Sequence, residues 1–255
     1  MPLDLVTIPC LSDNYAYLLH DRASGQTALV DVPEPGPILA ALKARGWTLG
    51  QIFITHHHAD HIDGVAEVVA ETGAKVLGAA ADAHRLPKLD RTLAEGDTVT
   101  VGGETGQVLD VSGHTMGHIA FVFPASGLAF TADSLMAGGC GRLFEGTPAV
   151  MWASLSKLAA LPGETLICSG HEYTASNLRF AASIEPDNPA LQARIARVAA
   201  AREKGEATVP SVLSEELATN PFLRARLSHV KALVGMPDAP DAAVFGEIRG
   251  RKDRF

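Results

Sequence analysis

Short apolar runs separated by turn residues make up the first two-thirds of the chain. Runs rich in β-branched and aromatic residues predict strands, and they occupy residues 5–11, 15–21, 27–32, 51–56, 75–80, 98–103, 106–115, 119–124, 128–134 and 164–171. Apolar residues at helical spacing instead mark 37–45, 62–72 and 149–161. Gly46 and Gly73 are the expected C-terminal ends of the first two helices. Many strands interrupted by single helices predict an α/β fold in which helices cover sheets.

The pattern becomes helical after about Tyr173. Residues 188–205 place an apolar stripe on one helix face, formed by Leu191, Ile195, Val198 and Ala199. Residues 210–233 are also helical in pattern, with a break at Asn220–Pro221, and residues 245–255 form a basic tail. The chain therefore divides into an α/β domain over 1–173 and a helical domain over 174–255.

Composition and charge narrow the functional class. The chain has 255 residues, of which 47% are hydrophobic, and a net charge of −8, which argues against a nucleic-acid or polybasic membrane protein. No apolar run reaches the roughly 18 to 20 residues that span a bilayer, and the N-terminus lacks a signal-peptide pattern. Cys10, Cys140 and Cys168 lack the spacing of a metal or redox pair. We expect a cytoplasmic monomer with reduced thiols.

Four histidines and an aspartate are concentrated in the segment Thr55–His61, directly after an apolar strand. Alternate side chains of an extended segment share a side, so His56 and His58 should point together and His57 away. Asp60 and His61 follow where the next helix begins. This pattern favours one metal held by His56 and His58 and a second held by Asp60 and His61, over a histidine-rich surface loop.

Further candidate ligands lie at other strand ends. His114 lies in a Gly- and Thr-flanked turn, Asp133 ends the strand at 128–134, and His171 ends the strand at 164–171. Each alone could be structural, but together with the histidine segment they complete two sites suited to catalytic metals. Two such ions can share one carboxylate, and Asp133 is the expected bridge. We assign a structural or supporting role to His118 and a surface position to the remaining three, His20, His84 and His229.

The combination of THHHADH, GHTMGH, TADS and CSGHEYT closely resembles the metallo-β-lactamase superfamily and, within it, the hydroxyacylglutathione hydrolases (glyoxalase II), over essentially the whole chain. The resemblance implies an αββα sandwich with the metal site at one edge, followed by the C-terminal α-helical domain. It also implies a ligand partition that agrees with the one reached from spacing: His56, His58 and His114 for one ion, Asp60, His61 and His171 for the other, and Asp133 for both.

The resemblance implies that a glutathione thioester is bound by residues on either side of the last metal histidine. The matching positions are Arg142, Phe144, Tyr173, Arg249 and Lys252. Arg and Lys suit the two carboxylates of glutathione, although the basic residues could simply form a solvated end. The family usually has Lys at position 142 and Tyr at 144. Phe144 therefore lacks a hydroxyl donor, and a neutral hydrogen bond contributes about 0.5–1.5 kcal/mol, so we expect weaker binding rather than loss of activity.

The implied reaction is hydrolysis of S-D-lactoylglutathione, or related 2-hydroxyacyl glutathiones, to glutathione and a hydroxy acid, the second step of methylglyoxal detoxification. Asp60 and Asp133 would be the catalytic carboxylates, and a hydroxide shared by two divalent ions the nucleophile. We expect zinc, with iron or manganese as alternatives. One rival is a mono-iron glutathione persulfide dioxygenase on the same fold, which would not need Asp60, His61 and His171. Others are a lactonase or β-lactamase, and a metal-binding module without catalysis.

Overall fold

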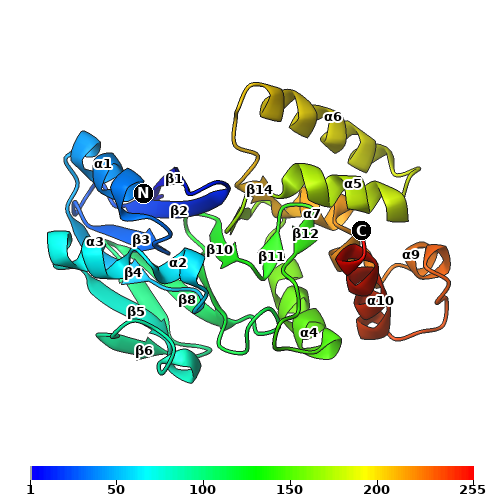
Figure 1. The fold of residues 1–255 in the computed structure, drawn as a ribbon, viewed down its shortest axis with the longest axis horizontal. Coiled ribbons are helices and arrows are strands. Elements are labelled where there is room, and N and C mark those ends of the chain that lie inside the picture. Colours follow the sequence, from blue (N-terminus) through cyan, green and yellow to red (C-terminus); the bar gives the residue numbers. More distant parts are fainter. Residues whose placement is uncertain (1) are drawn as a thin grey trace. The chain divides into compact units, whose positions relative to one another are not determined.

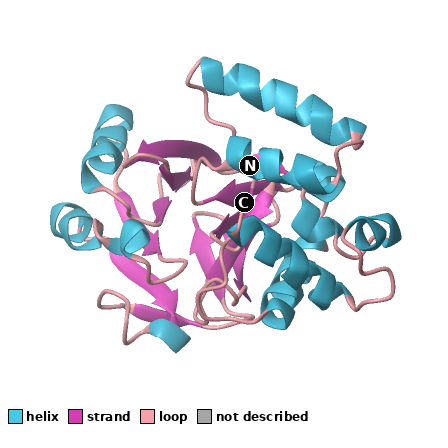
Figure 2. Cartoon of the chain, turned by 45° about the vertical axis from the view of Figure 1, so that its right-hand side comes forward, coloured by secondary structure: helices cyan, strands magenta, loops and turns pink. Residues whose placement is uncertain are grey.

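The computed structural model describes residues 2–255, which form two compact units (Figures 1 and 2). Unit 1 extends to Val111 and includes Thr115–Ala132. Unit 2 contains Ser112–His114 and Asp133–Phe255. The predicted domain boundary near residue 173 thus differs from the division by contacts and stays a prediction. Within residues 2–255, the helices are all too short or too polar to cross a bilayer.

The first sheet of unit 1 follows the order β1-β2-β3-β4-β5-β6. Its strands β1–β3 are antiparallel and β3–β6 parallel. Every residue of β2 and β3 is buried, as expected for strands that read as continuous apolar runs. The bounds are β1 (Asp4–Cys10), β2 (Asn14–His20), β3 (Thr27–Val30), β4 (Leu49–Phe53), β5 (Lys75–Ala79) and β6 (Arg91–Leu93).

Helices α1 (Pro35–Arg45), α2 (Ala59–Ile62) and α3 (Val65–Thr72) and a 3₁₀ turn (Ala80–Asp82) connect these parallel strands. Ile38 of α1 and Val68 of α3 are fully buried in one cluster with Ile52 of β4, which places both helices against this sheet. Gly46 and Gly73 end α1 and α3 in the left-handed conformation, at φ 67° and 70°. Both predicted helix ends are confirmed. Glycine is favoured at such an end because it has no Cβ atom to oppose the left-handed conformation.

The second layer of unit 1 is the antiparallel run β10-β9-β8-β7. Its strands are β7 (Thr98–Val101), β8 (Glu104–Asp110), β9 (Ile119–Phe123) and β10 (Leu128–Ala132). The rings of Phe53 and Phe121 stack with centroids 5.1 Å apart, and Tyr17 meets Phe130 at 5.5 Å. Because each pair joins one strand of either layer, the two layers pack face to face around an aromatic core.

Unit 2 is mainly helical. Its strands are β11 (Leu135–Met136), β12 (Gly139–Cys140), β13 (Leu166–Ser169) and β14 (Ser211–Val212). Its helices are α4 (Pro148–Ala159), α5 (Thr174–Ile184), α6 (Pro189–Glu203), α7 (Leu213–Thr219), α8 (Pro221–Arg224), α9 (Ser228–Leu233) and α10 (Asp241–Asp253). The expected break at Asn220 is confirmed, because its side-chain oxygen accepts from Phe222 N at 3.1 Å and caps α8.

Two sequence predictions are wrong. Residues 245–255, predicted as a basic tail, mostly belong to α10, whose Phe245, Ile248 and Arg249 are buried, so the alternative of a solvated end is also excluded. His20 is not a surface residue either. It is buried, its ring stacks on Trp47 at 4.0 Å, and its Nδ1 lies 2.9 Å from Thr27 Oγ1. In both cases the aromatic or apolar partner lies too far along the chain for a local pattern to reveal it.

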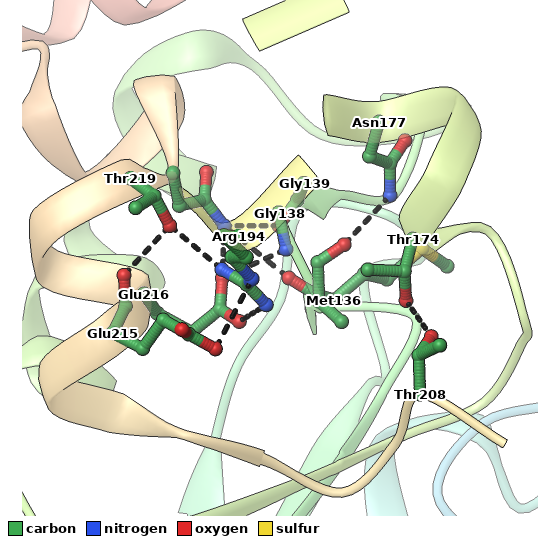
Figure 3. A network of polar contacts seen from close by, with 12 residues as sticks. Met136, Gly138, Gly139, Thr174, Asn177, Arg194, Thr208, Glu215, Glu216 and Thr219 are labelled. Atoms are coloured by element: carbon green, nitrogen blue, oxygen red, sulfur yellow. Dashed lines mark hydrogen bonds and ion pairs between the residues drawn. The ribbon is translucent and has the colours of Figure 1, made fainter. Parts of the chain in front are cut away.

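The apolar stripe predicted for α6 contains a charge. Ala199 is exposed, whereas Arg194, three residues after Leu191, is buried. Figure 3 shows how this guanidinium is compensated: it pairs with the buried carboxylate of Glu216, and Nη1 donates to Thr219 Oγ1 at 2.7 Å. A buried charge requires such partners.

The same network holds the β11–β12 hairpin. Glu216 Oε2 accepts from Gly138 N at 2.8 Å, and Asn220 Nδ2 lies within 3.2 Å of the Met136 and Gly139 carbonyls. Asn177 Nδ2 donates to the Ala137 carbonyl at 3.1 Å from the other side (Figure 3). Every backbone bond named here satisfies a buried group of a tight turn, so unit 2 fixes the segment between Asp133 and Arg142.

Candidate functional site

Asp31 organises the histidine segment of unit 1. Its carboxylate accepts from Thr55 N and Thr55 Oγ1, both at 2.8 Å, and lies 2.8 Å from His61 Nδ1. Asp31 is buried and has a left-handed backbone, at φ 57°, a conformation that Asp tolerates better than most residues. The carboxylate fixes the imidazole of His61 with Nδ1 toward it, so Nε2 is the nitrogen suited to a metal. Asp31 was not predicted from the sequence, although its carboxylate directly follows the buried strand β3 and that position was the available signal.

His56 and His58 lie side by side, and His57 points elsewhere. The distance from His56 Nε2 to His58 Nδ1 is 3.2 Å, and His56 Nδ1 lies 3.0 Å from Thr55 Oγ1. His57 Nδ1 instead lies 3.0 Å from Asp82 Oδ2, a carboxylate that also binds Arg85. This is the arrangement that alternation in an extended segment produces.

Asn14, which was also not predicted from the sequence, holds Asp60 in place. Asn14 Nδ2 lies 3.0 Å from both the carbonyl and the Oδ2 atom of Asp60. Oδ2 lies 3.9 Å from His61 Nε2, and 42% of the Asp60 side chain is exposed. Asp60 thus combines a fixed position with access to small molecules.

In unit 2, Asp133 lies between two imidazoles. Its Oδ2 is 3.5 Å from His114 Nε2 and 3.3 Å from His171 Nε2, and all three residues are buried. His114 Nδ1 lies 2.8 Å from the Arg142 carbonyl, to which it can only donate, so Nε2 carries the lone pair. A Cβ atom at Gly141 would lie 2.0 Å from the Asp133 carbonyl oxygen, so this close approach requires glycine.

The side chains of both units have the chemistry of metal ligands. Imidazole nitrogens and carboxylate oxygens suit zinc, iron and manganese. The groups of three such side chains that could hold an ion are drawn from His56, His58, Asp60, His61, His114, Asp133 and His171. Within residues 2–255, no such group includes His57 or His118. His118 instead stacks on His56, with ring centroids 4.6 Å apart.

The residues expected to bind substrate all belong to unit 2. The ring of Tyr173 stacks on His171 at 4.6 Å, and the ring of Phe144 meets His114 edge-on at 5.3 Å, so both exposed aromatic residues adjoin candidate ligands. Lys252 Nζ lies 3.3 Å from the Ser176 carbonyl and 5.3 Å from the Phe180 ring centroid. Burial lowers the pKa of Lys252 to about 8.

The two arginines differ in exposure and share one carboxylate. Arg142 keeps 57% of its side chain exposed, whereas Arg249 is only 6% exposed as a residue. Arg142 Nε and Arg249 Nη2 both lie 3.1 Å from Asp253 Oδ1, and Arg249 Nη1 donates to the Cys140 carbonyl at 2.9 Å.

Two family models together match nearly the whole chain. Residues 12–171 match the metallo-beta-lactamase superfamily, and residues 172–255 match the hydroxyacylglutathione hydrolase C-terminus. The first match covers the histidine segment and the other candidate ligands. The second covers Tyr173, Arg249 and Lys252.

Individual relatives agree with these matches. A hydroxyacylglutathione hydrolase from Cereibacter sphaeroides (strain ATCC 17025 / ATH 2.4.3) is 67% identical over 255 residues, which is 100% of either chain. The crystal structure of ETHE1 from Myxococcus xanthus is 25% identical with a TM-score of 0.67, and the match covers 99% of this chain and 98% of that one. The crystal structure of TTHA1623 in a di-iron-bound form is 31% identical with a TM-score of 0.57, over 66% of this chain and 91% of that one.

Proposed function

From the premise that the chain belongs to the hydroxyacylglutathione hydrolase (glyoxalase II) family of the metallo-beta-lactamase superfamily, we propose which residues carry out its reaction. The reaction is hydrolysis of the thioester of S-lactoylglutathione to glutathione and lactate. The observation that carries this conclusion is the 67% identity to a hydroxyacylglutathione hydrolase across the full length of both chains. The same match disfavours a glutathione persulfide dioxygenase.

The fold and the His and Asp groups suggest a dinuclear metal site. We assign His56, His58 and His114 to one ion, Asp60, His61 and His171 to the other, and Asp133 to both. Two hydrogen bonds support this assignment: Asp31 engages Nδ1 of His61, and the Arg142 carbonyl engages Nδ1 of His114. In both histidines Nε2 is therefore left for a metal. Two divalent ions, when bound, lower the pKa of water and polarise a carbonyl group. We propose zinc, with iron or manganese as alternatives.

Asp60 and Asp133 are the proposed catalytic carboxylates. Asn14 fixes Asp60, whose partly exposed carboxylate can accept a hydrogen bond from the attacking water and orient it. Asp133 contributes the negative charge that two cations require. The leaving group is a thiolate, which departs without a strong general acid. The proposed mechanism therefore assigns no residue to that role.

Substrate binding is assigned to the five residues of unit 2. Arg142 and Lys252 suit the carboxylates of glutathione, and Arg249 adds positive charge from a buried position. Phe144 and Tyr173 offer exposed rings for the tripeptide and adjoin His114 and His171.

We also propose that the enzyme works in the cytoplasm as a monomer, without nucleic-acid or membrane partners, in the second step of methylglyoxal detoxification. The cysteines support a reducing compartment. Cys10, Cys140 and Cys168 are buried and unpaired by disulfides, and burial raises the pKa of Cys10 and Cys140 to about 11.

The test is release of free thiol from S-D-lactoylglutathione by the purified, metal-replete protein, with a coenzyme A thioester beside it. We expect fast release from the glutathione ester alone. Equal release from both would refute the assigned glutathione-binding residues. Release from neither would refute the hydrolase assignment. In the same assay, Asp133→Asn should reduce kcat by several orders of magnitude, and near-normal turnover at full metal content would refute the bridging role.

A further inference from the structure

Asp253, the last residue of α10, occupies an unusual electrostatic position. The C-terminal end of a helix carries partial negative charge, so a carboxylate there is unfavourable unless cations compensate it. Two guanidinium groups do so, since Arg142 Nε and Arg249 Nη2 lie at 3.1 Å from the same Oδ1 atom. Asp253 therefore depends on both arginines.

Stability alone gives a weak reason for this arrangement. The Arg142–Asp253 pair is exposed, with 57% and 36% of the two side chains accessible, and pairs of this kind contribute about 0–1 kcal/mol. The pair differs from an ordinary surface ion pair because a buried residue, Arg249, also holds Asp253. Arg249 is buried, donates to the Cys140 carbonyl at 2.9 Å, and lies 5.1 Å from the Phe222 ring centroid, so Asp253 is held from one side by a fixed group.

The anchored carboxylate uses only one of the donors of Arg142. Arginine has five N–H donors in a planar fork, and Asp253 takes the one on Nε. Within residues 2–255, no group accepts a hydrogen bond from Nη1 or Nη2 of Arg142. The Nη1/Nη2 edge is the geometry that binds a carboxylate through two parallel hydrogen bonds.

Building on the proposed function, we propose that Asp253 is a positioning residue for substrate recognition: it holds Arg142 by Nε and so presents the Nη edge to a carboxylate of the glutathione moiety. Because Arg142 and Arg249 share this one carboxylate, one positive charge remains in excess for the carboxylates of the tripeptide. A lysine at position 142 could not divide its donors in this way, since its single ammonium would serve both partners.

The test compares Asp253→Asn with Asp238→Asn, a matched control that removes one exposed carboxylate from the loop before α10. For S-D-lactoylglutathione, Asp253→Asn should raise KM about five- to tenfold and leave kcat within about twofold. The control should change neither. In an Arg142→Ala background, Asp253→Asn should have no further effect, because the residue it positions is gone.

A neutral substrate separates positioning from a structural role. Lactoyl N-acetylcysteamine has no carboxylate, so wild type and Asp253→Asn should cleave it at equal kcat/KM. An equal loss on both thioesters, or a loss that persists beside Arg142→Ala, would overturn the inference. If the wild type is active and Asp253→Asn has an unchanged KM for S-D-lactoylglutathione, the inference is likewise overturned. Failure of the wild type to cleave S-D-lactoylglutathione would instead refute the proposed function itself.

Discussion

Replacing Glu216 with alanine should destabilise unit 2 strongly, and the size of the effect follows from its contacts. The carboxylate is fully buried and accepts from Arg194, from Gly138 N and from Asn220 Nδ2. Removing one partner of a buried ion pair costs about 3–5 kcal/mol, because the other charge stays buried. Arg194 retains Thr219 Oγ1 at 2.7 Å and a Glu215 oxygen at 3.2 Å, so we expect the lower end, about 3 kcal/mol.

For a chain of this length, each kcal/mol shifts Tm by about 2–4 °C, so Glu216→Ala should lower Tm by about 6–12 °C in differential scanning calorimetry. Glu203→Ala, which removes an exposed glutamate at the end of α6, is the matched control and should shift Tm by less than about 2 °C.

The double variant Arg194→Ala/Glu216→Ala provides the sharper test. Once the guanidinium is also removed, the unpaired buried charge disappears, so the combined loss should be clearly smaller than the sum of the single losses. Additive losses would show that Arg194 and Glu216 act independently. A Tm for Glu216→Ala within about 2 °C of wild type would refute the reasoning about the buried network.

Three further predictions concern the site. Asp31→Asn keeps the left-handed backbone but places an amide where the carboxylate meets His61 Nδ1. The affinity for metal should fall about 10–100-fold, measured as the metal content that remains after dialysis against a weak chelator. Full retention of the metal would contradict the orienting role of Asp31. Because burial lowers the pKa of Lys252 to about 8, its charge is present below that pH and lost above it. KM should therefore rise between pH 7 and pH 9 in wild type and stay flat in Lys252→Arg, and equal rises would exclude Lys252. Phe144→Tyr should lower KM several-fold by restoring a donor worth about 0.5–1.5 kcal/mol, and an unchanged KM would show the hydroxyl to be irrelevant.

Local patterns predicted the elements and the ligand types. The alternation in Thr55–His61 separates His57 from its neighbours because an extended segment alone determines that orientation. Likewise, Gly46 and Gly73 end their helices through backbone geometry that depends on one residue.

Features that depend on a distant partner could not be read in this way. Arg194 interrupts an apolar helix face, and only Glu216, 22 residues later, makes it a core residue. The charged segment around Arg249 and Lys252 resembles a solvated end until Phe222 and Asp253 are seen to flank Arg249. Asp31 acquires its role from Thr55 and His61, 24 and 30 residues away.

The backbone and the side chain of Arg142 have separate tasks. The carbonyl orients the imidazole of His114, while the guanidinium extends toward Asp253 and the exposed surface. A substitution at this position changes the second contact and leaves the first, because every residue carries a carbonyl group. Under the proposed roles, substrate preference can thus evolve, or be engineered, at position 142 while the orientation of the proposed metal ligand His114 stays unchanged.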